Sequence, residues 1–222
     1  MITMRGLCVL LVLAALASPA AAATITIFDS YGSTLGGEFR ATASGLPFTP
    51  GALLLDPADT FETFCVEANE YISFGSIYYA DVSTAAVNGG LGGGNPDPLD
   101  PLTAYLYTKF ITGSLAGYSY DAADAGGLRT ASANALQQVI WYIEGEASKV
   151  WVDGDASLMN QFYQDAFVNA GPDIGNVRVL NLWGDEARTQ PAQDQLILIP
   201  EPATLLLALG GLMLLSRSRR RR

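Results

Sequence analysis

The C-terminal segment is the feature that most constrains what this 222-residue chain can fold into. A Pro-Glu-Pro turn is followed by an apolar run over residues 203–215 and then by a cluster of arginines. The apolar run is shorter than the roughly 20 residues that a permanent transmembrane helix needs. Arginine resists transfer across a bilayer, so the cluster should stay on the cytoplasmic side. We therefore predict that residues 199–222 form a membrane address and that the folded body lies before them.

This order of turn, apolar run and basic tail resembles the PEP-CTERM sorting signal of Gram-negative bacteria, which a membrane-embedded exosortase recognises. The resemblance covers only the end of the chain and implies a route, not an activity. It implies exosortase and the secretion machinery as partners, transient anchorage in the membrane, and delivery to the cell surface or extracellular matrix of a Gram-negative bacterium. The alternative, an ordinary tail anchor, has no need of the Pro-Glu-Pro turn. The sorting motif would be Pro200, Glu201 and Pro202, and the membrane stop would be Arg217, Arg219, Arg220, Arg221 and Arg222.

The N-terminus has the pattern of a secretory signal peptide. Arg5 precedes an apolar stretch over residues 7–17, and small residues suited to cleavage occupy positions 18–23. We predict cleavage after Ala22 or Ala23, and Cys8 lies too early for a lipoprotein cleavage site. The predicted organisation is a signal peptide at 1–23, an exported surface domain at 24–198 and a sorting signal with a transmembrane segment at 199–222. The body then lies outside the cytoplasmic membrane.

The composition of the body excludes several functions. Arg5 and the five tail arginines are six of the 12 basic residues, so the stretch from Asp29 to Glu201 holds six basic and all 22 acidic residues, a formal charge of −16. Such a surface repels nucleic acid phosphates, so no nucleic acid partner is expected. The chain has no histidine, which excludes a Ser-His-Asp triad, a Cys-His dyad and a His-ligated metal. We expect no enzyme, no metal and no cofactor.

Residue patterns in the body predict an α+β fold in a single domain, with strands flanking a helical middle. Asp100 is a suitable N-cap for the first helix, which Gly113 should end. The glycine-rich segment 88–96 lacks the Gly-Lys-Ser/Thr ending of a phosphate-binding loop, so we read it as a flexible loop. Strands are predicted at 24–28, 38–42, 60–67, 71–74, 77–82, 177–183 and 194–198, and helices at 100–112, from 130 or 132 to 144, and at 156–168.

Cys65 has no intramolecular disulfide partner once the signal peptide with Cys8 is removed. Three interpretations stay open. The thiol is buried and inert, as free cysteines often are; it pairs with another chain; or it reacts with a side chain elsewhere in the same fold.

The third interpretation gains support from a second segment. The pair Phe64-Cys65, together with the run 137–141 that begins with Gln137 and ends with Trp141, resembles the motif pair of thioester domains in bacterial surface adhesins. In that family a strand cysteine and a helix glutamine condense, with loss of ammonia, into an internal thioester that an amine of a target can attack. The resemblance implies that Cys65 carries the sulfur and Gln137 the acyl carbon. The alternative is that Gln137 and Gln138 are polar positions at the edge of an amphipathic helix.

Other candidate sites are weaker. Asp153 and Asp155 alternate like calcium ligands, but the rest of that pattern is missing, so a turn and helix cap are expected. Glu144 and Glu146 lie two apart and should be solvated charges, not a glycosidase pair. Six tyrosines suggest either an adhesive surface or core positions: Tyr78, Tyr79, Tyr105, Tyr107, Tyr118 and Tyr120.

Together these features favour an exported surface or biofilm-matrix protein that acts in adhesion, through surface amines if the thioester forms. The alternative is a non-covalent structural or carbohydrate-binding component of the extracellular polysaccharide matrix.

Overall fold

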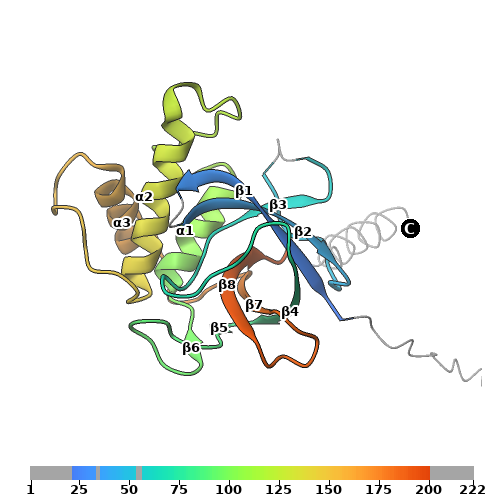
Figure 1. Ribbon diagram of the computed structural model, residues 1–222. Helices are drawn as coiled ribbons and strands as arrows, with labels where there is room; N and C mark the ends of the chain where they lie inside the picture. The colour runs from blue at the N-terminus through green and yellow to red at the C-terminus, as the bar shows by residue number, and fades with distance from the viewer. Residues whose placement is uncertain (1–21, 34–35, 54–56, 201–222) are drawn as a thin grey trace, which may run out of the picture.

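The computed structural model describes residues 22–33, 36–53 and 57–200 (Figure 1). The predicted signal peptide up to residue 21, and the predicted tail from Glu201 onward, lie outside the described residues. That tail includes Pro202 and all five arginines of the predicted membrane stop. No helix within the described ranges has the length and apolar character needed to cross a membrane.

The body is a mixed α/β fold built on a six-stranded antiparallel sheet, which agrees in outline with the predicted class. The strand order is β3-β2-β1-β4-β7-β8. The main strands are β1 (Thr24–Ser33), β2 (Gly36–Ser44), β3 (Thr60–Thr63), β4 (Ile77–Ser83), β7 (Val177–Trp183) and β8 (Pro191–Leu198). A small second sheet pairs β5 (Ala85–Ala86) with β6 (Asp97–Pro98), and the helices are α1 (Pro101–Ile111), α2 (Leu128–Ile143) and α3 (Leu158–Asn169), with a 3-10 turn η1 at Ala125–Gly127.

The helix boundaries follow local capping. Asp100 caps α1 by accepting a hydrogen bond from the backbone N of Leu102 at 2.7 Å, as its sequence position predicts. Ser157 caps α3 by accepting from Asn160 N. Helix α2 begins before the predicted residue 130, because the Asp124 carboxylate accepts from the backbone N of Arg129 and so supports the first turn from outside the helix.

Two predicted strands differ from the structure. Residues 71–74 are not a strand but part of an irregular loop, in which Tyr71 is 80% exposed. The predicted strand 60–67 is regular only over β3, and beyond it Cys65 forms a single bridge to Gln195 of β8. The reason is a change of partner: β3 pairs with β2 up to Thr63, and the chain then turns to β8.

This change of partner brings the two ends of the sheet together. Leu196 N donates to Phe64 O at 3.0 Å, Val66 N donates to Asp194 O at 3.0 Å, and the Thr63 hydroxyl donates to Leu196 O at 2.7 Å. The sheet is therefore curled, and its first and last strands meet at Cys65.

Each face of the sheet carries its own core. Phe64 belongs to the cluster shared with the helices and packs edge-on against Phe110 of α1 at a ring distance of 5.0 Å. Cys65, one residue on, belongs to the other cluster with Phe61 and Ile197, as the alternation of side chains along an extended chain requires, and Trp141 of α2 reaches this cluster too. Figure 1 shows the helices gathered on one side of the sheet, with α2 contacting β1, β2 and α3.

A buried ion pair fixes α2 against the sheet. The Arg129 guanidinium, 3% exposed, bonds the carboxylate of Glu38 in β2, and the Tyr118 hydroxyl donates to the same carboxylate. Arg129 also stacks over the ring of Tyr31 at 4.0 Å. Removing one partner of a buried ion pair lowers stability strongly, because the other charge is left buried and unpaired, whereas replacing both partners by apolar residues often costs little. This pair therefore fixes the position of α2 more than it adds to stability.

Candidate functional site

Cys65 and Gln137 are brought into direct contact, although 72 residues separate them. The backbone N of Cys65 donates to Gln137 Oε1 at 3.1 Å, and Gln137 Nε2 donates to the carbonyl oxygen of Cys65 at 2.9 Å. Gln137 is 1% exposed and Cys65 is 1% exposed. The two residues that the thioester resemblance picks out are therefore neighbours in a buried site.

The Gln137 amide lies in a gap in the β2–β3 ladder. Phe39 pairs with Thr63, so a continued register would pair Gly37 with Cys65. Instead, Gly37 N donates to the same Oε1 of Gln137 at 3.3 Å. A carboxamide offers the donor and acceptor that a peptide group offers, and here it satisfies backbone groups of both strands.

A glycine lets α2 come this close to β2. At Gly36, φ is +143°, and an added Cβ would lie 2.7 Å from Trp141 Cη2 and 2.9 Å from Gln137 Cγ. Any larger residue would push the helix and its glutamine away from the sheet. Gly36 therefore sets the distance between Gln137 and the strand that carries Cys65.

The Cys65 thiol is held in its neutral form. Burial raises the pKa of Cys65 to about 12, and a hydrogen bond with the Gln195 side chain opposes this shift only in part. Reactive cysteines that work as free thiolates have a lowered pKa, and Cys65 is not of that kind. A thiol this deeply buried is also not presented to another chain, which argues against the intermolecular disulfide considered from the sequence.

Two buried carboxylates lie beside the pair, and no motif in the sequence points to them. Glu67 Oε2 accepts from the backbone N of Asp194 at 2.9 Å, and within the described part of the chain Glu67 Oε1 has no partner. Burial, helped by the charge of Asp194, raises the pKa of Glu67 to about 10. Asp194 accepts from the backbone N of Val87 and Leu182 and from Asn181, and burial raises its pKa to about 6.

A pocket of about 270 Å³ opens beside this site. Its walls include Trp141, Gly36, which lies next to Gln137, and Gln193, whose Nε2 donates to Glu67 O at 2.8 Å. The outer wall is the loop around Tyr71 and Phe74. The remaining lining residues are Phe39, Ala68, Glu70 and Ile72.

The two glutamates expected to be solvated are buried instead. Glu144 is 8% exposed and accepts from the backbone N of Asp100, and burial raises its pKa to about 7. Glu146 is 3% exposed and accepts from the backbone N of Ala68, Leu91 and Gly92. Glu146 thus ties the glycine-rich loop to the chain after Cys65. Sequence spacing described their relation to each other but could not show these distant backbone partners.

The other sequence candidates have structural roles. Asp155 accepts from Ser157 N at 3.0 Å, so this loop is the expected turn and helix cap. Among residues 22–33, 36–53 and 57–200, no three acidic or cysteine side chains are grouped to hold a metal ion. Tyr78, Tyr107 and Tyr118 are core residues, and Tyr79, Tyr105 and Tyr120 are partly buried. The six tyrosines do not form an exposed adhesive surface.

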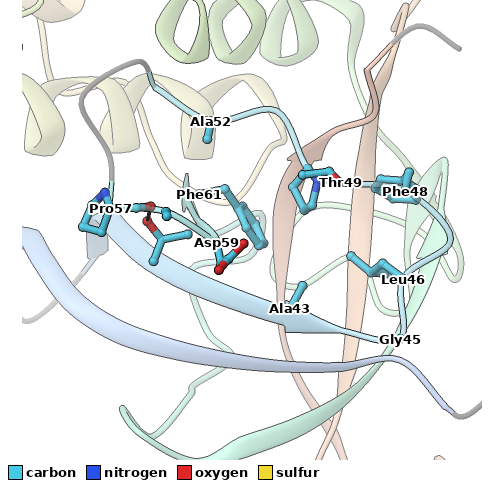
Figure 2. Close-up of a pocket in the computed structure, with 12 residues that line it drawn as sticks. Ala43, Gly45, Leu46, Phe48, Thr49, Ala52, Pro57, Asp59 and Phe61 are labelled. Atoms are coloured by element: carbon cyan, nitrogen blue, oxygen red, sulfur yellow. Dashed lines mark hydrogen bonds between the residues drawn. The ribbon is translucent and has the colours of Figure 1, made fainter. Parts of the chain in front are cut away.

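A second pocket, of about 320 Å³, lies at the other end of β2 (Figure 2). Ala43, Phe61 and Asp59 are among the residues that line it, and Asp59 is exposed there. Its lining includes none of Gly36, Cys65, Gln137 and Trp141. Of the sorting motif, only Pro200 is described.

No family model, curated protein or solved structure matches this chain.

Proposed function

We propose that this protein is an exported bacterial surface or biofilm-matrix protein whose body forms an internal thioester between Cys65 Sγ and Gln137 Cδ for covalent adhesion. The observation that carries the proposal is the pair of hydrogen bonds between the Gln137 amide and the Cys65 backbone, at 3.1 and 2.9 Å. They hold the acyl group of one residue against the residue that bears the thiol. This contact joins two segments that were paired on motif grounds alone.

The chemistry is a balanced exchange of acyl partners. In formation, Cys65 Sγ bonds to Gln137 Cδ, the C–N bond breaks, and ammonia leaves with the proton of the thiol. In attachment, the nitrogen of a target amine bonds to Cδ, the C–S bond breaks, and a proton returns to sulfur. Burial of both side chains excludes water from the activated acyl group until the target arrives.

The proposed location follows from the two ends of the sequence. The signal peptide pattern takes the body across the inner membrane, and the Pro-Glu-Pro tail hands it to exosortase at the outer side of that membrane. Transient anchorage, processing and release to the cell surface or matrix would follow. A covalent bond to a target amine suits an exported protein, because the bond persists after release and needs no further supply of protein or energy from the cell.

A non-covalent matrix component is the second candidate. Two observations favour it: the Gln137 amide already fills a gap in the sheet, and the Cys65 thiol has Gln195 as a hydrogen-bond partner and a pKa of about 12. Both residues would then have a purely structural role. An enzyme is not proposed.

The intact mass of the protein, purified after export, tests the proposal. A thioester leaves the mass short by one ammonia, and incubation with methylamine adds the mass of one methylamine to that reduced mass. Cys65→Ser and Gln137→Ala should abolish both effects. Gln138→Ala, which changes the neighbouring amide on the same helix, is the matched control and should keep both.

A full mass that methylamine does not change, with a Cys65 thiol that is alkylated on unfolding, would overturn the thioester. It would leave the non-covalent matrix role.

A further inference from the structure

The pocket beside Trp141 borders the proposed thioester site. Gly36 and Trp141 line it, and Gly36 lies next to the Gln137 side chain, since a Cβ on Gly36 would come within 2.9 Å of Gln137 Cγ. The pocket and the buried amide of Gln137 therefore share Gly36 as a neighbour. The second pocket, at the other end of β2, has no such contact.

The pocket wall combines apolar surface with a single charge. Phe39 and Phe74 meet edge-on at a ring distance of 5.2 Å and, with Trp141, give it an aromatic lining. Glu70 is the one charged residue among those that line the pocket, and it is half-buried. Asn88 Nδ2 donates to Glu70 Oε1 at 3.3 Å and orients the carboxylate.

We propose that this pocket is the entrance for the attacking nucleophile and that Glu70 selects a linear primary alkylammonium there, such as a lysine side chain. The inference rests on the proposed thioester. The apolar walls match the methylene stem of such a group, and the carboxylate matches its cationic end. A neutral or anionic nucleophile is not attracted electrostatically to the Glu70 carboxylate.

Glu70 can also prepare the ammonium for attack. An ammonium has no free electron pair, so it must lose a proton before its nitrogen can bond to Gln137 Cδ. Burial, together with the charge of Glu146, raises the pKa of Glu70 above its usual value, which makes this carboxylate a better proton acceptor. The proton passes from nitrogen to Glu70, the C–N bond forms as the C–S bond breaks, and Cys65 sulfur takes the second proton that the nitrogen loses.

The neighbouring carboxylates shape the same field. Glu146 and Asp194 lie within electrostatic range of Glu70 and add negative charge, whereas Glu67, with a pKa of about 10, is neutral at pH 7. No basic residue lines the pocket. The site therefore offers a cation no competing positive charge.

The experiment compares two nucleophiles on the exported protein and on Glu70→Gln. Butylamine is cationic at neutral pH, whereas hydroxylamine is largely uncharged there, and intact mass follows the reaction of each with the thioester. Glu70→Gln should slow butylamine by about fivefold or more, the size expected for loss of one partly exposed charge pair, and should leave hydroxylamine nearly unchanged. Asp59→Asn, which removes one negative charge in the other pocket, is the control and should change neither.

The outcomes separate the two proposals. A mass short by one ammonia in Glu70→Gln shows that the variant is folded and that the thioester stands. If its preference for butylamine then equals that of Asp59→Asn, Glu70 is not the selecting residue and this inference is overturned alone. If no chain shows the mass deficit, the thioester and the inference fall together.

A second variant tests the pocket independently of charge. Phe74→Ala removes an aromatic wall at a 49% exposed position, so the fold should tolerate it. Lengthening the alkylamine from methyl to butyl should then raise the rate less than it does in the unsubstituted protein. An unchanged dependence on chain length would show that the nucleophile enters elsewhere.

Discussion

The side-chain amide of Gln137 takes, against Cys65, the place that the Gly37 peptide would take if β2 and β3 stayed paired for two more residues. It bonds the N and O of Cys65 and accepts from Gly37 N as well. By filling this gap, the Gln137 amide both stabilises the sheet and places its own carbonyl carbon beside Cys65. The structural and the chemical roles of Gln137 can be separated by measurement, because one does not need sulfur.

Gln137 should matter for stability even without the thiol. In a Cys65→Ser background no covalent bond can form, and Gln137→Ala leaves three backbone groups without their partner. We expect the free energy of unfolding to fall by about 3 kcal/mol, since each buried group left unpaired costs about 1–3 kcal/mol. Chemical denaturation measures it. Gln138→Ala in the same background should cost well under 1 kcal/mol, and equal losses would argue against the gap-filling role.

Gly36→Ala should separate α2 from the sheet. The new methyl group would lie 2.7 Å from Trp141 Cη2, at a φ of +143° that side chains disfavour. We expect a loss of about 2–3 kcal/mol in unfolding free energy and loss of the ammonia deficit in the intact mass. Gly171→Ala is the control, because a Cβ there meets nothing within 4 Å. A Gly36 variant with full stability and an intact deficit would contradict the proposed spacing.

Stability should fall as pH rises from 5 to 7.5. Burial raises the pKa of Glu144 to about 7, so between its unfolded pKa of about 4.5 and that value the folded state binds the extra proton. Raising the pH through this window therefore favours the unfolded state, and Asp194, with a pKa of about 6, adds to the effect. In denaturation experiments, Glu144→Gln should make the decrease in unfolding free energy over this pH range smaller by up to about 3 kcal/mol. Glu186→Gln, at an exposed position, should leave the slope as it is, and an unchanged slope in Glu144→Gln would show that Glu144 does not hold the proton.

Processing of the tail should depend on the Pro-Glu-Pro turn. Replacing Pro200 and Glu201 by Ala keeps the apolar run and the arginines but removes the predicted recognition motif. We expect a full-length form to accumulate in the membrane fraction, detected by its intact mass. Replacing Thr204 by Ala, inside the apolar run, is the control and should leave maturation unaffected. Normal maturation of the Pro200 and Glu201 variant would argue against exosortase recognition.

Local signals predicted the parts of the fold that local chemistry controls. Asp100 and Ser157 cap helices because their side chains reach backbone groups two or three residues away. The start of α2 is not predictable from a local cap, because the N-cap is Gly127 and the first turn is supported by Asp124, five positions before the residue that it bonds. The strand expected at 71–74 has strand-forming residues, but within that segment the structure shows a single backbone hydrogen bond to a strand, from Gln193 N of β8 to Tyr71 O, and no continuous ladder.

The site could be predicted only where a motif pair links residues that are far apart in the sequence. Cys65 and Gln137 were paired on the thioester resemblance, and the structure brings the two residues together. Gln195, Glu67 and Asp194 could not be found in the same way, because their environment comes from the meeting of β3 with β8, and no local pattern encodes it. Glu146 was misread for the same reason, since its partners lie more than 50 residues away in the chain.

The meeting of β3 with β8 also decides how the body would carry a mechanical load. Strand β8 is the last element in the described part of the chain, so a tether at its C-terminal end would pull on β8 first. The strand is bonded along its length to β7 on one side and, through Gln195 and Leu196, to the chain around Cys65 on the other. Tension along β8 would therefore shear several hydrogen bonds at once instead of opening them one by one. A target held at Gln137 would pull on α2, which packs on β1 and β2, so load from the target and load from the C-terminal end would enter the sheet through different strands.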